Sequence, residues 1–120
     1  MPDLPVIDPQ ALDNLRALTP DDNDAFLREI AGIFLEDTPL RIAELDESLA
    51  AGDVPKFTRA AHSIKGSSSN LGALTLRAAA EHLEHQSKTA GLNGVAPLVT
   101  AVKTEFARTK LELGRLIPAN

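Results

Sequence analysis

The residues most suited to chemistry lie in the stretch AHSIKGSSSNLGA, which runs from Ala61 to Ala73. It places His62 and Lys65 one helical turn apart and follows them with Gly66 and three serines, where the surrounding pattern predicts a helix. A glycine inside a helix costs about 1 kcal/mol relative to alanine. The question is therefore why this helix is weakened beside a histidine.

The helical phase predicts that His62 is exposed. The apolar positions predict an inner line for this helix made of Phe57, Ala61, Ile64 and Ser68. At about 100° per residue, His62 lies about 130° from that line. Lys65 and Ser69 follow on the same side, and Gly66 lies directly above His62.

An exposed imidazole can act as a nucleophile that carries a group covalently. The ammonium group of Lys65 favours an anionic group, most simply phosphoryl. Gly66 removes a side chain beside the ring, so that another macromolecule can approach it. The sequence contains neither a GxxxxGK[ST] loop nor a kinase loop set. The phosphoryl group is therefore expected to come from a phosphorylated partner and not from ATP.

Each of these residues also has a structural interpretation. His62 could be an ordinary surface histidine, Lys65 a solvated lysine, and Gly66 a packing glycine, although its outward phase argues against packing. We interpret the serines that follow as small structural residues that bond to helix carbonyl groups, and Gly72 as a turn glycine.

A second histidine pair occurs in EHLEH, where His82 and His85 stand three residues apart. Such a pair with two glutamates could bind a metal ion on one helix face. Only two imidazoles are available there, and no third ligand is evident. We therefore interpret EHLEH as a solvated helix face.

The composition limits the possible functions. The 120 residues contain no cysteine and carry a net charge of −5, from 12 basic and 17 acidic residues. One domain of this size can bury its own core. Because clustered cations and aromatic platforms are missing, nucleic-acid binding is not expected. No apolar run approaches the roughly 20 residues that span a membrane, and no signal peptide is recognised. The sequence favours a cytoplasmic protein without membrane association.

Amphipathic patterns predict an all-α protein, an antiparallel up-down four-helix bundle with a short extra N-terminal helix packed across one end. Residues 1–7 are expected to be loose, and residues 8–118 to form the single domain. The short helix starts at Asp8-Pro9. The predicted long helices run over about 23–51 with a kink at Pro39, from about 54 to 71, over about 73–90, and from about 95 to 116.

The first half of the long helix carries a second apolar stripe, made of Phe26, Ile30 and Ile33. The short N-terminal helix is the obvious element to cover it. A partner that reaches the imidazole needs an apolar patch with a polar rim. The doubled apolar face predicts a patch beside His62 that is made of Leu12, Leu15 and Leu27, with Ser69 on the same surface.

With these residues in place, the stretch resembles the signature of histidine-containing phosphotransfer (HPt) domains of two-component phosphorelays. That signature has the form H-x-[hydrophobic]-K-G-[S/A]-[S/A]-x-x-[hydrophobic]-G. The matching residues are His62, Ile64, Lys65, Gly66, Ser67, Ser68, Leu71 and Gly72. Helix order and lengths extend the resemblance, more weakly, over about residues 5–117.

The resemblance implies a mechanism. The phospho-aspartate of a receiver domain donates its phosphoryl group to Nε2 of His62, which then passes it to the aspartate of a second receiver. Lys65 would stabilise the phosphoryl oxygens, Gly66 would let the receiver dock, and Glu84 would orient the imidazole. The domain would need no cofactor of its own, since Mg²⁺ belongs to the receiver.

The partners implied are receiver domains of response regulators and a hybrid sensor histidine kinase, with the domain itself acting as a monomer without kinase activity. Three other functions stay open from the sequence. The bundle could bind receivers without transferring phosphate, it could be the histidine domain of a chemotaxis-type kinase, or it could be a helical metal-binding or enzyme domain.

Overall fold

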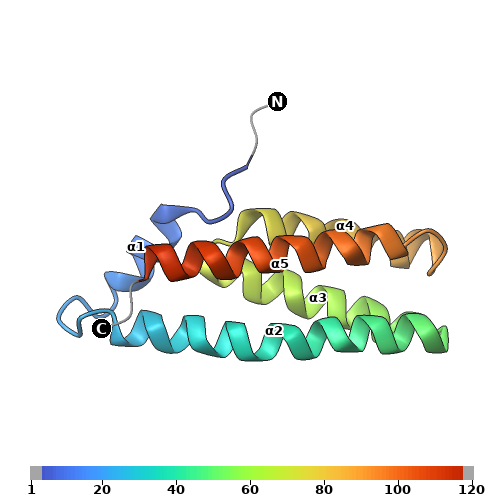
Figure 1. The fold of residues 1–120 in the computed structure, drawn as a ribbon, viewed down its shortest axis with the longest axis horizontal. Coiled ribbons are helices and arrows are strands. Elements are labelled where there is room, and N and C mark those ends of the chain that lie inside the picture. The colour runs from blue at the N-terminus through green and yellow to red at the C-terminus, as the bar shows by residue number, and fades with distance from the viewer. Residues whose placement is uncertain (1–3, 118–120) are drawn as a thin grey trace.

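The computed structural model describes residues 4–117. Within them the chain forms five helices: α1 (Pro9–Arg16), α2 (Ala25–Ala51), α3 (Val54–Leu71), α4 (Leu74–Ala90) and α5 (Ala96–Leu116). The four long helices run antiparallel, and each packs against two neighbours in the cyclic order α2, α3, α4, α5 (Figure 1). The predicted four-helix bundle is confirmed.

An acidic residue and a proline set the starts of α1 and α3, as the sequence predicts. Asp8 accepts a hydrogen bond from the backbone N–H of Gln10, and Asp53 accepts one from Lys56. Helix α2 starts two residues later than expected because Asn23 and Asp24 have left-handed backbones, with φ of 55° and 65°. It then continues through Pro39 without interruption.

The core fills the space between the four long helices with aliphatic side chains and two phenylalanines. Its largest members include Leu27, Phe34, Leu45, Phe57, Ile64, Leu76, Leu83 and Val102. Leu12 of α1 is 1% exposed and belongs to this core as well. Burial of this apolar area supplies most of the driving force that holds the helices together.

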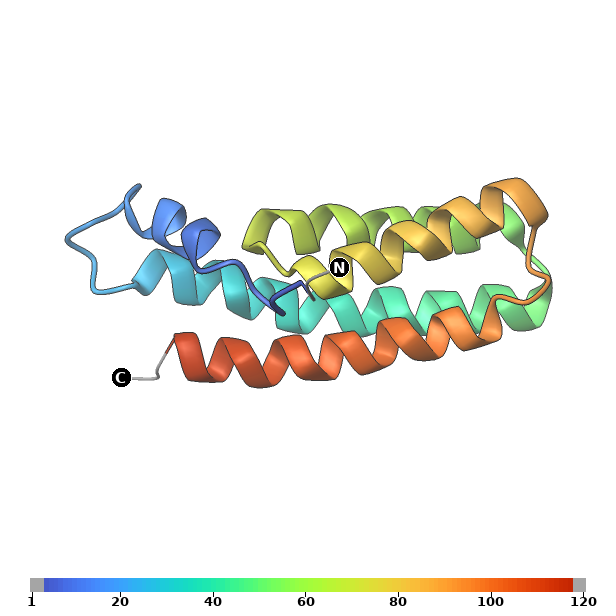
Figure 2. The ribbon, with the colours of Figure 1, turned by 90° about the horizontal axis from the view of Figure 1, so that it is seen from above.

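Helix α1 packs across the end of the bundle at which α3 turns into α4 (Figures 1 and 2). The backbone N–H of Asp8 donates to the carbonyl of Gly72 at 2.8 Å, and that of Leu74 donates to the carbonyl of Val6 at 3.0 Å. Val6 and Ile7, which the sequence assigned to a loose segment, are instead fixed here, and Ile7 is 3% exposed. Residues 1–3 of that segment and the domain end at residue 118 lie outside the described residues.

Two apolar predictions need correction. Leu12 and Leu27 were expected on a docking surface, but each is 1% exposed because each faces the core. Leu15 is half-buried against that core. The stripe on α2 is not fully covered by α1 either, since Ile33 is 60% exposed. An eight-residue helix is too short to reach along the whole stripe.

Candidate functional site

The imidazole of His62 projects from the outer face of α3, as the helical phase predicts. Its side chain is 65% exposed, whereas the neighbouring Ala61 and Ile64 are fully buried. Gly66, four residues on, has nothing within 4 Å of the point where a Cβ would lie. The surface above the ring is therefore clear for a partner.

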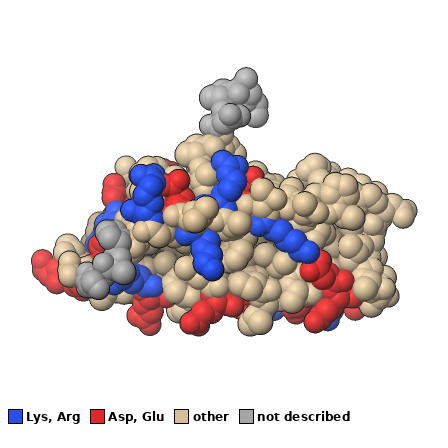
Figure 3. Space-filling view, in the orientation of Figure 1, with Lys and Arg blue, Asp and Glu red and all other residues tan. Residues whose placement is uncertain are grey.

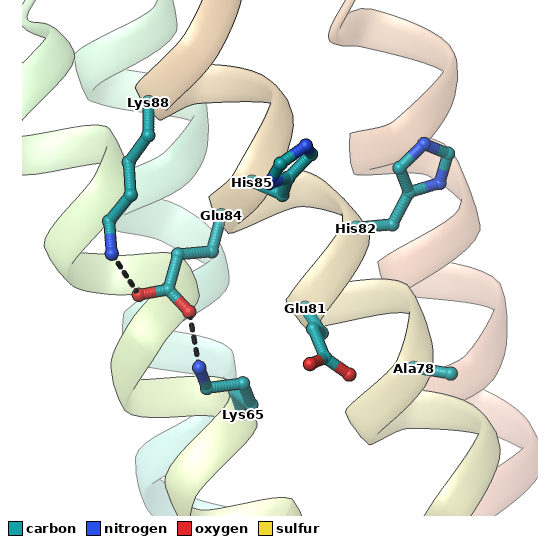
Figure 4. A pocket seen from close by; sticks show the side chains of 7 residues that line it. All are labelled: Lys65, Ala78, Glu81, His82, Glu84, His85 and Lys88. Carbon is teal, nitrogen blue, oxygen red and sulfur yellow. Dashed lines mark ion pairs between the residues drawn. The ribbon is translucent and has the colours of Figure 1, made fainter.

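Glu84 of α4 is the group that organises the site. Its carboxylate is 6% exposed, and Oε2 lies 2.8 Å from Nδ1 of His62. Lys65 Nζ lies 2.6 Å from Oε1, and Lys88 Nζ lies 3.2 Å from Oε2 (Figure 4). One carboxylate thus accepts from an imidazole and two ammonium groups that come from two helices.

The environment of Glu84 keeps it ionised. Burial raises the pKa of its carboxyl group, but hydrogen bonds from Lys65, Lys88 and His62 outweigh that effect and bring the pKa down to about 2. An ionised carboxylate can only accept hydrogen bonds. Nδ1 of His62 must therefore carry the proton, which leaves the lone pair of a neutral ring on Nε2.

The three serines that follow Gly66 differ in their exposure and in their hydrogen bonds. Ser69 is exposed, donates to the carbonyl of Lys65 and accepts from Nε of Arg77, each at 2.9 Å. Ser67 bonds to the carbonyl groups of the preceding turn, and Ser68 is fully buried. Ser67 and Ser69 thus bond to helix carbonyl groups as the sequence analysis expects, whereas the prediction is wrong for Ser68, whose buried hydroxyl has no hydrogen-bond partner among the described residues.

Lys88 is a site residue that the sequence analysis did not identify. It stands one turn after Glu84 on the same helix, so the i,i+4 spacing of an acidic and a basic residue was a visible signal. Its position beside the histidine depends on how α4 packs on α3, which the spacing does not reveal.

The EHLEH segment lines a hollow of about 470 Å³ beside this cluster. In Figure 4 the rings of His82 and His85 extend away from Glu84. Over residues 4–117, no three side chains of His, Cys, Asp or Glu are arranged to hold a metal ion. In that same part of the chain, no helix is long and apolar enough to cross a membrane.

Comparison with known proteins identifies the family. Residues 29–112 match the family model described as the Hpt domain, which covers helices α3 and α4 and most of α2 and α5. The chain belongs to the Hpt domain family. Hpt domains are phosphotransfer intermediates of two-component signalling, so the resemblance seen in the sequence is confirmed.

Individual relatives agree with this membership. Over 96 residues, which are 80% of this chain, it is 30% identical to multistep phosphorelay regulator 1 of Schizosaccharomyces pombe. The chain spans about a third (32%) of the length of that relative.

Solved structures of other Hpt proteins share the fold. Histidine-containing phosphotransfer protein B from Pseudomonas aeruginosa PAO1 superposes with a TM-score of 0.84 at 27% identity, over 94% of this chain and 95% of that one. A histidine-containing phosphotransfer protein from Medicago truncatula gives a TM-score of 0.81 at 20% identity, over 92% and 76% of the two chains.

Proposed function

We propose that this Hpt domain is a phosphocarrier between receiver domains, and that Nε2 of His62 carries the phosphoryl group. One observation supports this most strongly. The exposed imidazole of His62 donates its Nδ1 proton to a carboxylate that stays ionised, which leaves a nucleophilic lone pair on the solvent side. An ordinary surface histidine has no such buried partner.

In the proposed step, the Nε2 lone pair attacks the phosphorus of a receiver phospho-aspartate. A P–N bond forms, the P–O bond to the aspartate breaks, and that aspartate leaves as a carboxylate. The ring becomes positively charged because it keeps the proton on Nδ1. Oε2 of Glu84 lies 2.8 Å from Nδ1, accepts that proton in a hydrogen bond and stabilises the developing charge. The reverse step returns the phosphoryl group to the aspartate of a second receiver.

Lys65 and Lys88 supply positive charge to the same carboxylate, Lys65 at Oε1 and Lys88 at Oε2, the oxygen that also faces His62. A phosphoryl group on Nε2 would bring two negative charges next to them, so either ammonium can move from Glu84 to a phosphoryl oxygen. We therefore assign the stabilisation of the phosphoryl oxygens to Lys65, and we assign the same role to Lys88. Mg²⁺ and the other catalytic groups are assigned to the receiver, and no ATP-dependent step to this chain.

The docking surface that we propose lies on α2 and α3. Ile33 and Leu40 are each 60% exposed and stand seven residues apart on α2. A groove of about 120 Å³ beside Ile33 is bordered by Ser67 and Asn70 of α3, on the turns that follow His62. Exposed apolar side chains within a polar rim are typical of a transient interface.

The proposal is tested by mixing the domain with phosphorylated receivers and measuring acid-labile, base-stable phosphate on it. The wild type should be labelled, and His62→Gln should carry no label. His82→Gln is the matched control, because it removes another exposed histidine and should be labelled like the wild type. Equal labelling of His62→Gln would overturn the site, and absence of label on the wild type from any receiver would overturn the function.

A further inference from the structure

Arg59 is a cation beside the site that the proposed transfer step does not use. It precedes His62 by one helical turn on α3, and it is exposed. Lys65 and Lys88 both bind Glu84, but Arg59 makes no ion pair with any residue in the range 4–117. It therefore presents a full positive charge to whatever approaches the histidine.

Most basic side chains elsewhere in the described part of the chain, unlike Arg59, form ion pairs with acidic side chains. Lys and Arg gather over α5 on the face seen in Figure 3. Lys103, however, lies 3.0 Å from Asp46, and Arg108 lies 3.0 Å from Glu105. An unpaired arginine one turn from the histidine is a different case.

Arg59 and His62 line one groove of about 480 Å³ between the first half of α3 and the second half of α4. Thr58 and Ser87 also line it, and a 2.7 Å hydrogen bond between their hydroxyl groups links the two helices. Lys88 contributes a second cation from α4. The groove thus reaches His62 and carries one cation on each side, Arg59 on α3 and Lys88 on α4.

The charges around the histidine favour an acidic occupant. Arg59, Lys65 and Lys88 set three positive charges against the one negative charge of Glu84, on a chain whose net charge is −5. The proposed partner brings a phospho-aspartate together with carboxylates that hold Mg²⁺. Opposite potentials raise the rate of encounter and discriminate between partners.

We infer that Arg59 is a specificity-determining residue that binds the acidic rim of a phosphorylated receiver in this groove. The inference rests on the proposed function and adds a means by which the domain ranks receivers. Arg59 does not touch Glu84, so it stands outside the cluster that orients the imidazole. It acts on docking of the protein partner and not on the reactivity of Nε2.

The test compares Arg59→Glu and Arg59→Ala with Lys110→Glu. Lys110 is exposed on α5, a helix that does not pack against α3, and it has no ion pair within the described residues. Transfer from a phosphorylated receiver is measured at 50 and 500 mM NaCl, and direct labelling by the small donor phosphoramidate is measured in parallel. Thermal unfolding checks that each variant is folded.

At 50 mM NaCl we expect Arg59→Glu to lower the second-order rate of transfer about tenfold and Arg59→Ala about threefold, with less than a twofold change for Lys110→Glu. At 500 mM NaCl the differences should shrink to about twofold or less because salt screens them. Phosphoramidate should label all variants equally.

Three outcomes would contradict the inference. An unchanged receiver rate in Arg59→Glu would show that the groove does not bind the receiver. Slower labelling by phosphoramidate would place Arg59 in the chemistry of His62 instead of in docking. If no phosphorylated receiver labelled the wild type, the proposed function would be overturned, and this inference with it.

Discussion

Two glycines of the same motif, Gly66 and Gly72, have opposite environments. A Cβ at Gly66 would have nothing within 4 Å, on the open surface above His62. A Cβ at Gly72 would lie 2.4 Å from Cβ of Ala11, and the backbone there is left-handed with φ of +68°. The carbonyl of Gly72 also accepts a hydrogen bond from Asp8.

The difference shows that the motif meets two separate requirements. Its first half keeps the surface near the imidazole free for a partner. Its second half lets α3 end in a tight turn and lets α1 approach the backbone closely. The same residue type serves both ends, so only the packing distinguishes a glycine needed for a partner from one needed for the fold.

The largest expected effect is on stability, from Gly72→Ala. A left-handed backbone costs an alanine about 1–2 kcal/mol, and the overlap with Ala11 adds about 1–3 kcal/mol because helix α1 must shift. We expect the free energy of unfolding to fall by about 4 kcal/mol in denaturant titrations.

Gly52→Ala provides the matched control. Gly52 ends α2 with nearly the same φ, +69°, but nothing lies within 4 Å of its Cβ position. It should lose only the backbone part, about 1–2 kcal/mol. Equal losses in the two variants would mean that the contact with α1 adds nothing.

The next largest effect is on the pH dependence of stability and concerns Glu84. The ion pairs of this carboxylate at the exposed site also stabilise the folded domain. Its pKa is lowered from 4.5 to about 2, so its contribution is present above pH 4.5 and is lost as the pH falls toward 2. The difference corresponds to about 3 kcal/mol. Between pH 5 and pH 2, the free energy of unfolding of the wild type should fall by that much more than that of Glu84→Gln. Parallel pH profiles would contradict the role of the ion cluster.

A smaller effect is expected from Ile33→Asp on the proposed docking surface. Because Ile33 is 60% exposed, stability should change by less than about 0.5 kcal/mol. Receiver affinity, measured by calorimetry, should weaken about tenfold, or about 1.4 kcal/mol. Leu111→Asp is the control, since Leu111 is 77% exposed but lies on α5. If both variants bound the receiver alike, the docking surface would lie elsewhere.

The sequence predicts the features that depend on a single helix, but not those that depend on how the helices pack. Helical phase placed His62 on the surface because one helix fixes the directions of its own side chains. The docking prediction at Leu12 and Leu27 was wrong because a stripe does not reveal which neighbour covers it. The contacts of His62 and Lys65 with Glu84 join α3 to α4, so they depend on packing that local periodicity does not contain.

The last expected effect is also the most direct test of the comparison between the two glycines. Gly66→Ala should raise the free energy of unfolding by up to about 1 kcal/mol, because alanine is the better helix former and meets no neighbour. Gly114→Ala on α5, which also meets nothing within 4 Å, should gain a similar amount. Only Gly66→Ala should slow transfer from a receiver, because only its methyl group lies on the surface beside the imidazole. A stabilised Gly66→Ala with an unchanged transfer rate would show that the open surface is not what the partner requires.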